Sequence, residues 1–185
     1  MKKVLVYILM LISVVFISGC GDSFTKKEQD DFKEEIMNEL KVDKLFQGTG
    51  VFVTLDSSFV EYESDVWDMY LYNGEFAFMS QRISKQSNLN GMSYSQLTLK
   101  QYFQLVMTTN NFESYIYEEK TIYGDDLLYC YIKTRDANAE LDYGYMMMVM
   151  ESDSFFYTMN LSCDHEQLDT NKALFERYGK SISVK

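Results

Sequence analysis

The sequence predicts an α+β domain with an antiparallel sheet that is covered on both faces. Residues 113–163 contain four consecutive strand-like segments separated by polar turns. Residues 145–150 are apolar at every position, which is typical of a strand buried on both faces. Helical patterns that begin near Thr98 and Thr170 lie before and after these strands, so each supplies a helix to pack against the sheet.

The chain has 185 residues, 46% of them hydrophobic, and a formal net charge of −11. This size and apolar content are sufficient for one domain with a core, and they exclude intrinsic disorder as its main state. A net negative charge repels phosphate groups, so the sequence excludes nucleic acid as a partner. The same charge also keeps a domain soluble, and by itself it does not name a cationic partner.

The first twenty residues have the layout of a secretory signal. Two lysines precede an uncharged run over residues 4–17, which is short for a membrane span and typical of a signal peptide. The segment from Ile17 to Cys20, Ile-Ser-Gly-Cys, resembles the lipobox of bacterial lipoproteins; an uncleaved anchor helix is the alternative. The resemblance implies that residues 1–19 are removed and that the Cys20 thiol carries lipid. The protein would then be anchored on the extracytoplasmic face of a bacterial membrane.

Residues 20–47 are predicted to connect this anchor to a globular domain over 48–185. Thr25 and Glu28 fit a capping box at the start of a helix over 26–46. One narrow apolar stripe follows at four-residue spacing, made by Phe32, Ile36 and Leu40. We expect this stripe to pack against the globular domain; a stalk that binds a partner is the alternative.

The first part of the globular domain is predicted to be strands. The glycines of Gly48-Thr49-Gly50 end the preceding helix, and residues 51–55 form a strand that turns at Ser57-Ser58. Residues 67–72 and 76–79 alternate like the two strands of a hairpin. Asn73-Gly74 between them is typical of a two-residue turn that needs positive φ angles.

A polar loop over 84–95 leads into the main amphipathic helix. Thr98 and Gln101 form a second capping box. The helix is expected to end at Asn110-Asn111, where an asparagine takes the left-handed C-terminal position. Its apolar face is formed by Leu99, Tyr102, Phe103, Val106 and Met107.

The four strands are expected to form a simple meander. They cover residues 115–123, 127–133, 143–150 and 155–163, and the strand over 145–150 lies centrally. A last helix, capped by Thr170, carries Leu174, Phe175, Tyr178 and Ile182 on its apolar side.

Two cysteines remain beside Cys20, namely Cys130 and Cys163. Each lies on the same face of its predicted strand as apolar residues, so both are expected to be buried. In the meander one strand lies between them, which separates their strands by about 9–10 Å. A disulfide does not span that distance. The sequence therefore predicts two buried free thiols.

This order of elements resembles the PsbP-like fold, which is shared by a photosystem extrinsic subunit, a Ran-binding import factor and many small bacterial lipoproteins. The similar stretches are residues 50–59, 97–102, and 155–161 with 175–184. The resemblance implies an αβα sandwich around an antiparallel sheet and no shared catalytic residues. It also implies that binding or assembly is the usual role of such a domain.

The sequence offers two weak candidates for chemistry. His165 is the only histidine and follows Cys163 and Asp164, but neighbouring side chains at a strand end point apart rather than converge. Oxygen ligands alternate from Asp136 as in a calcium loop, yet the sixth position is Leu141 and the twelfth is Met147. An exposed loop histidine and a solvated loop are the simpler interpretations. We predict no metal and no cofactor.

Fifteen tyrosines are the most unusual feature of the composition. Six of them repeat in pairs along three strands: Tyr115 and Tyr117, Tyr129 and Tyr131, and Tyr143 and Tyr145. A row of them across neighbouring strands would form an aromatic platform for a protein partner. In the alternative they lie beneath a helix with their hydroxyls at the rim.

Together these features predict a membrane-anchored, non-catalytic module that binds another protein outside the membrane. Two alternatives remain. The first is an immunity lipoprotein whose acidic surface neutralises a cationic secreted toxin. The second is a hydrolase or small-ligand carrier with a cleft near His165.

Overall fold

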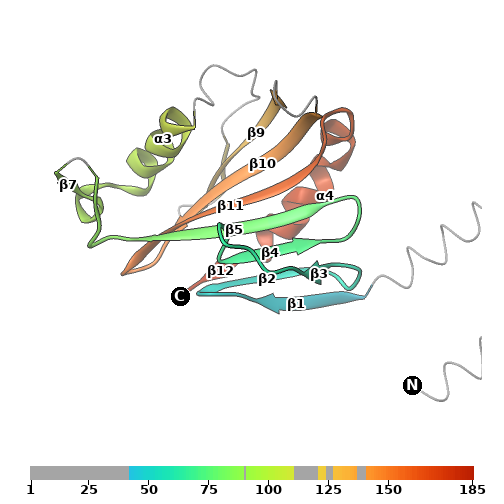
Figure 1. Ribbon diagram of the computed structural model, residues 1–185, viewed down its shortest axis with the longest axis horizontal. Coiled ribbons are helices and arrows are strands. Elements are labelled where there is room, and N and C mark those ends of the chain that lie inside the picture. The colour runs from blue at the N-terminus through green and yellow to red at the C-terminus, as the bar shows by residue number, and fades with distance from the viewer. Residues whose placement is uncertain (1–41, 90, 111–120, 124–126, 137–140) are drawn as a thin grey trace, which may run out of the picture. The chain divides into compact units, whose positions relative to one another are not determined.

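A computed structural model describes residues 42–89, 91–110, 121–123, 127–136 and 141–185, as Figure 1 shows. Its main element is a seven-stranded sheet in the order β3-β4-β5-β11-β10-β9-β8. A three-stranded sheet, β1-β2-β12, and a short β6-β7 hairpin complete the strands. Every strand pair in these sheets is antiparallel. No helix within the described ranges is both long and apolar enough to cross a membrane.

The elements follow the chain from Asp43 to Val184. The helices are η1 (Tyr94–Gln96), α3 (Leu99–Thr109), η3 (His165–Gln167) and α4 (Leu168–Lys180). The strands are β1 (Asp43–Gln47), β2 (Val51–Asp56), β3 (Val60–Glu61), β4 (Met69–Tyr72), β5 (Ala77–Ser84), β6 (Asn88–Leu89), β7 (Met92–Ser93), β8 (Thr121–Tyr123), β9 (Leu127–Asp136), β10 (Leu141–Glu151), β11 (Phe155–Asp164) and β12 (Ser183–Val184).

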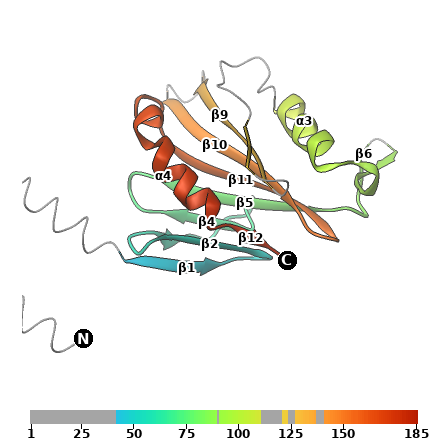
Figure 2. The ribbon, with the colours of Figure 1, turned by 180° about the vertical axis from the view of Figure 1, so that it is seen from behind.

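Helices α3 and α4 lie on opposite sides of β9–β11 in both Figure 1 and Figure 2. Side chains of β10 alternate between the two sides. Met146 and Met148 pack with the α4 core, whereas Met147 and Val149 pack with the α3 core. All four are at most 1% exposed, which confirms a central strand buried on both faces. The predicted strand order of the meander is confirmed as β8-β9-β10-β11; residues 115–120 of its first predicted strand lie outside the described residues.

The three-stranded sheet closes the α4 side of the core. Alternate residues of β2, namely Val51, Val53 and Leu55, are at most 1% exposed and belong to the core that α4 covers. Strand β12 pairs with β2, and the Tyr157 hydroxyl donates to the carbonyl oxygen of Lys185. The sequence pattern does not predict this pairing of the C-terminal segment with β2.

The predicted helix over 26–46 is wrong at its end, because Asp43–Gln47 is strand β1. The linking segment assigned to 20–47 therefore gives its last five residues to the sheet. Gly48-Thr49-Gly50 joins β1 to β2 as a hairpin turn, with Gly50 at φ +76° and the Gly48 N–H donating to the Val51 carbonyl at 2.9 Å. Residues 26–41 lie outside the described residues.

The β4–β5 hairpin forms as predicted, but its turn is shifted by one residue. The Asn73 N–H donates to the Phe76 carbonyl, so Gly74 and Glu75 are the central pair, and Gly74 has φ +93°. The Asn73 side-chain oxygen accepts from the Glu75 and Phe76 N–H groups at 3.0 and 2.7 Å. Asparagine thus shapes the turn through its side chain rather than through its own backbone angles.

The segment predicted as a loop over 84–95 is more ordered than expected. Strand β5 runs on to Ser84, and β6 and β7 form a small hairpin in which Gly91 has φ +86°. The Thr98–Gln101 capping box is confirmed. Asn110 caps α3 with φ −91° and so does not take the predicted left-handed position; Asn111, the other predicted candidate, lies outside the described residues.

Helix α4 begins at Leu168, two residues before the predicted cap at Thr170. Gln167 occupies the N-cap without a side-chain hydrogen bond, so capping does not place this end. Packing does: Leu168 is fully buried against Gly144, where an added Cβ would lie 2.7 Å from the Leu168 Cβ. A buried contact with β10 therefore outweighs the local capping preference.

Cys130 and Cys163 are both buried and free, as predicted. They lie on β9 and β11, with β10 between them. Cys130 belongs to the α3 core and Cys163 to the α4 core, so the sheet itself separates the two sulfur atoms.

Candidate functional site

The α3 side of the large sheet is only partly covered. Helix α3 packs on β9 and β10, and its Tyr102 ring stacks on Phe156 of β11 at 4.4 Å between ring centroids. Beyond this contact, a cavity of about 720 Å³ is lined by β4, β5, the first residues of β10 and the last residues of β11. We call this cavity the aromatic groove. Its ring-bearing residues are Trp67, Tyr70, Tyr72, Tyr143 and Tyr145.

Strand register explains why the groove is hollow. One row of paired residues crosses four strands from Tyr72 through Ala77 and Ser162 to Tyr145. Small side chains occupy the middle of this row and large rings stand at both ends. A sheet surface with that order has a depressed centre between aromatic walls, because successive strands are only about 4.8 Å apart.

The two tyrosines of β4 line the groove because successive side chains of a strand point to opposite faces of the sheet. Met69 and Leu71 are 2% and 0% exposed and face the α4 core, so Tyr70 and Tyr72 point to the opposite side. The Tyr72 hydroxyl donates to the Gly74 carbonyl at 2.8 Å. Tyr62 extends the aromatic surface, with its ring centroid 6.0 Å from that of Tyr70 and 6.4 Å from that of Tyr72.

Trp67 precedes β4 and lies in a turn, not in the strand predicted for 67–72. The Ser64 Oγ accepts from the Val66 and Trp67 N–H groups at 3.2 and 3.0 Å. Gln81 on β5 donates to the Val66 carbonyl at 3.2 Å and ties this turn to the sheet. These bonds hold the indole at the junction of the groove and a smaller hollow beneath α3.

The charges around the groove are negative. Glu75 and Asp164 are the charged residues among its described lining. A neighbouring hollow shares Trp67 and Tyr70 with it and is bordered by four more carboxylates, those of Glu61, Glu63, Asp65 and Asp68. We call residues 61–68 the acidic loop. The combined surface therefore favours a cation over an anion.

Two polar side chains of the groove have unmet hydrogen-bonding capacity. Asn160 Oδ1 and Gln167 Oε1 are buried and have no hydrogen-bond partner in the part of the chain that the structure describes. Both residues line the groove. A buried acceptor without a donor costs about 1–3 kcal/mol, so each of these oxygens favours a ligand that brings donors.

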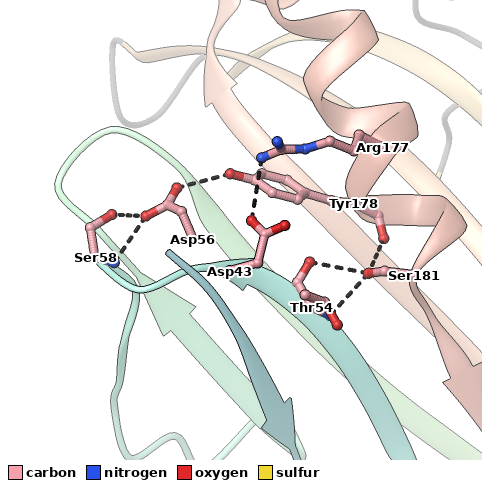
Figure 3. Close-up of polar contacts among 7 residues, drawn as sticks. All are labelled: Asp43, Thr54, Asp56, Ser58, Arg177, Tyr178 and Ser181. Carbon is pink, nitrogen blue, oxygen red and sulfur yellow. Dashed lines mark hydrogen bonds and ion pairs between the residues drawn. The ribbon is translucent and has the colours of Figure 1, made fainter. Parts of the chain in front are cut away.

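A second polar cluster, shown in Figure 3, is structural rather than ligand-binding. Asp56 is 2% exposed and accepts from the Ser58 N–H at 2.9 Å, from the Ser58 hydroxyl and from the Tyr178 hydroxyl at 2.8 Å. Burial and the bond to Asp56 raise the pKa of Tyr178 to about 12. This cluster joins the turn after β2 to α4.

The predicted tyrosine platform does not form as one row. Tyr129 and Tyr131 are 4% and 7% exposed and belong to the core that α4 covers. Their hydroxyls donate to Glu176 Oε1 of α4 at 3.4 and 3.1 Å. This arrangement matches the alternative, in which the rings lie beneath a helix with their hydroxyls at the rim. Little of either ring is exposed, so these two residues offer a partner little surface.

Tyr143 and Tyr145 lie in the aromatic groove, on the side of the sheet opposite Tyr129 and Tyr131. A role for the β10 pair in binding stays a prediction. Tyr115 and Tyr117 and the proposed lipid site Cys20 lie outside the described residues.

The groove residues that sequence reasoning missed are Trp67, Tyr70 and Tyr72. A signal for the two tyrosines was present, because Tyr70 and Tyr72 alternate with the apolar Met69 and Leu71. Alternation predicts that they share a face, but it does not say that α3 leaves this face open.

The residues proposed for hydrolysis are poorly placed for it. Burial, followed by the charges of Asp164 and Glu75, raises the pKa of the Cys163 thiol to about 12. The thiol is therefore protonated at neutral pH and weakly nucleophilic. His165 begins η3 and is absent from the described lining of the groove.

Of the weak calcium pattern, Asp136 ends strand β9 and Leu141 to Met147 form part of strand β10, while residues 137–140 lie outside the described residues. Among the described residues, no group of three or more His, Cys, Asp or Glu side chains is close enough to hold a metal ion.

Comparisons with known proteins identify the fold. The chain is similar to the solution structure of cyanobacterial PsbP (CyanoP) from Synechocystis sp. PCC 6803, with a TM-score of 0.50 and 13% identity. That match covers 91% of this chain and 99% of the other. A protein of unknown function from Pseudomonas aeruginosa, PA94, described as a putative regulator, aligns with a TM-score of 0.43 and 8% identity over 77% of this chain and 97% of its own. No protein-family model and no curated protein matches the sequence. The fold is PsbP-like, as the sequence predicted.

Proposed function

We propose that this PsbP-like domain is a non-catalytic binding module, held by lipid at Cys20 on the extracytoplasmic face of a bacterial membrane, whose aromatic groove binds a protein partner. The signal-like residues 1–19 and the segment from Ile17 to Cys20 support the anchor. Two acyl chains provide stable attachment, whereas one gives only reversible binding.

The observation that carries the binding role is the uncovered aromatic groove. Tyrosine and tryptophan offer large, rigid contact areas with polar edges, and such residues dominate protein interfaces. A domain of this size that leaves Tyr62 at 50% and Tyr72 at 37% exposed beside a groove of about 720 Å³ presents an interaction surface.

Catalysis finds less support than binding. The groove combines rings, amides and carboxylates, and the buried Cys163 thiol has a pKa raised to about 12. A nucleophile needs a lowered pKa or an adjacent base.

Site-specific crosslinking in living cells tests the proposal. A photoreactive benzophenone residue replaces Tyr72 in the groove, and in a matched strain it replaces Leu45 on β1, which is 62% exposed in the other sheet. We expect a discrete crosslinked protein from position 72 and not from position 45. Equal adducts at both positions, or none at position 72, would contradict a partner-binding groove.

A further inference from the structure

We infer that the occupant of the aromatic groove is a basic protein segment that inserts an arginine side chain between Tyr70, Tyr72 and Tyr143. The inference rests on the proposed binding function and names the chemistry of the partner. Four features of the groove carry it: its charge, its rings, its unpartnered oxygens and its continuity with the acidic loop.

The charge of the lining selects a cation. Glu75 and Asp164 belong to the described lining, and no Lys or Arg does. The acidic loop beside it adds Glu61, Glu63 and Asp65. Clefts lined by one sign of charge concentrate ligands of the opposite sign.

The rings can bind that cation directly. Elsewhere the protein covers ring faces with its own cations, as with Arg82 over Phe155 at 4.5 Å and Lys85 over Phe156 at 4.7 Å. Within the described residues, no Lys or Arg lies over Tyr70 or Tyr72. The planar guanidinium of arginine stacks on such faces better than an ammonium does.

The two unpaired amide oxygens of the groove favour a ligand that carries hydrogen-bond donors. Asn160 Oδ1 and Gln167 Oε1 are buried without partners in the described chain. A guanidinium carries five N–H donors and no acceptor, so it can satisfy amide oxygens and carboxylates at once. An anionic or acceptor-rich ligand would leave these oxygens unpaired.

The extent of the surface favours a chain segment over a small amine. The hollow of the acidic loop shares Trp67 and Tyr70 with the groove, and the hollow beneath α3 shares Trp67 and Asn160 with it. The three hollows thus adjoin at Trp67. Val60, which pairs with Tyr72, and Val66, which precedes Trp67 in the chain, are exposed apolar side chains. A segment with several residues can contact all of this surface, whereas a free amino acid fills only the centre.

Trp67 gives a direct readout, because it is the only tryptophan of the chain and it lines the groove. Full-length protein in non-ionic detergent is titrated with a blocked Gly-Arg-Gly-Arg-Gly peptide while its fluorescence is followed. The control peptide carries citrulline, which keeps the shape and removes the charge. We expect saturable binding of the arginine peptide, and binding of the citrulline peptide at least about tenfold weaker.

Matched variants locate the site. Glu75→Gln is expected to weaken binding about threefold, and Asp153→Asn, which removes one exposed charge at the β10–β11 turn, is expected to leave it unchanged. Tyr70→Leu combined with Tyr143→Leu removes the rings and is expected to weaken binding about tenfold. Far-ultraviolet circular dichroism shows whether each variant is folded.

Three results would overturn the inference: equal binding of the citrulline peptide, equal weakening by Asp153→Asn, or binding of free argininamide as tight as that of the peptide. In each case the crosslink from position 72 separates the two proposals. If that crosslink persists, the groove binds a partner of other chemistry, and only the arginine inference fails. If it is absent as well, the binding function fails with it.

Discussion

At the scale of single residues, the hydrogen bond from Tyr178 to Asp56 is expected to contribute to the free energy of unfolding. Tyr178 is 2% exposed, and its hydroxyl is a donor to a buried carboxylate. Tyr178→Phe leaves Asp56 with one donor fewer, so we expect a loss of about 1–3 kcal/mol in the free energy of unfolding. Urea denaturation measures it. Tyr72→Phe, which removes an exposed hydroxyl, should cost less than about 0.5 kcal/mol and serves as the control.

The same bond predicts a pH dependence. Burial and the bond to Asp56 raise the pKa of Tyr178 in the folded state from its ordinary value of about 10 to about 12. The folded state therefore holds this proton more tightly, and the resulting stabilisation is complete below pH 10 and lost as the pH rises through 12. The stability difference between the wild type and Tyr178→Phe should shrink over this range. A difference that stays constant in urea titrations at pH 9 and pH 11.5 would contradict the assignment.

The thiol of Cys163 should be inert in the native protein. It is 4% exposed, and its pKa is raised to about 12, so very little thiolate forms at pH 8. Iodoacetamide is expected to label Cys163 only after unfolding in urea, as read by mass spectrometry. A Ser87→Cys variant, whose new thiol lies at an exposed position, is the positive control. Native labelling of Cys163 at a comparable rate would contradict its burial.

At the scale of elements, β10 supplies side chains to both cores, so it should be the most sensitive strand. Met148 is fully buried. Met148→Ala should cost about 2–5 kcal/mol because it leaves a cavity, and Met148→Asp should cost more because it buries an unpaired charge. Leu45→Ala, at a strand position that is 62% exposed, provides the comparison and should cost much less. Thermal unfolding of the three variants tests this order, and a near-wild-type melting temperature for Met148→Asp would contradict it.

Where a helix begins depends on core packing first and on local capping second. The α3 start agrees with its capping box, because Thr98 and Gln101 satisfy each other's backbone groups locally. The α4 start does not follow a cap, because burying Leu168 against Gly144 gains more than a side-chain bond from Thr170 would. Local capping therefore predicts a helix end only where no core contact competes with it.

At the scale of the whole molecule, the two sides of the large sheet are covered to different extents. The α4 side is closed by a helix and a second sheet, and it holds the core that contains Phe175 and Tyr157. The α3 side is covered over β9–β11 and open over β4 and β5, where the groove lies. We therefore expect stability to depend on the first side and partner binding on the second.

The proposed lipid anchor is tested at this scale too. Cys20→Ala should block incorporation of a radiolabelled or alkyne-tagged fatty acid and leave an unprocessed precursor of higher mass. Cys130→Ala is the matched control and should keep the label. Continued labelling of the Cys20→Ala protein would contradict lipid attachment at this residue.

Features that depend on near neighbours in the chain could be predicted from the sequence. The capping box at Thr98, the four-strand meander and the strand buried on both faces all follow from short-range periodicity. The free state of Cys130 and Cys163 followed from strand order alone. The PsbP-like fold was also predictable, because the order of elements carries it.

The groove required the tertiary structure. Alternation shows that Tyr70 and Tyr72 share a face, and likewise Tyr129 and Tyr131, but it does not say which pair a helix covers. The hollow depends on the strand register, which places the small side chains of Ala77 and Ser162 between two tyrosines. These tyrosines come from strands that are about 70 residues apart in the chain. The pairings of β1 and β12 with β2 are equally non-local. Such contacts are chosen by the burial of the whole core, which no short segment of sequence contains.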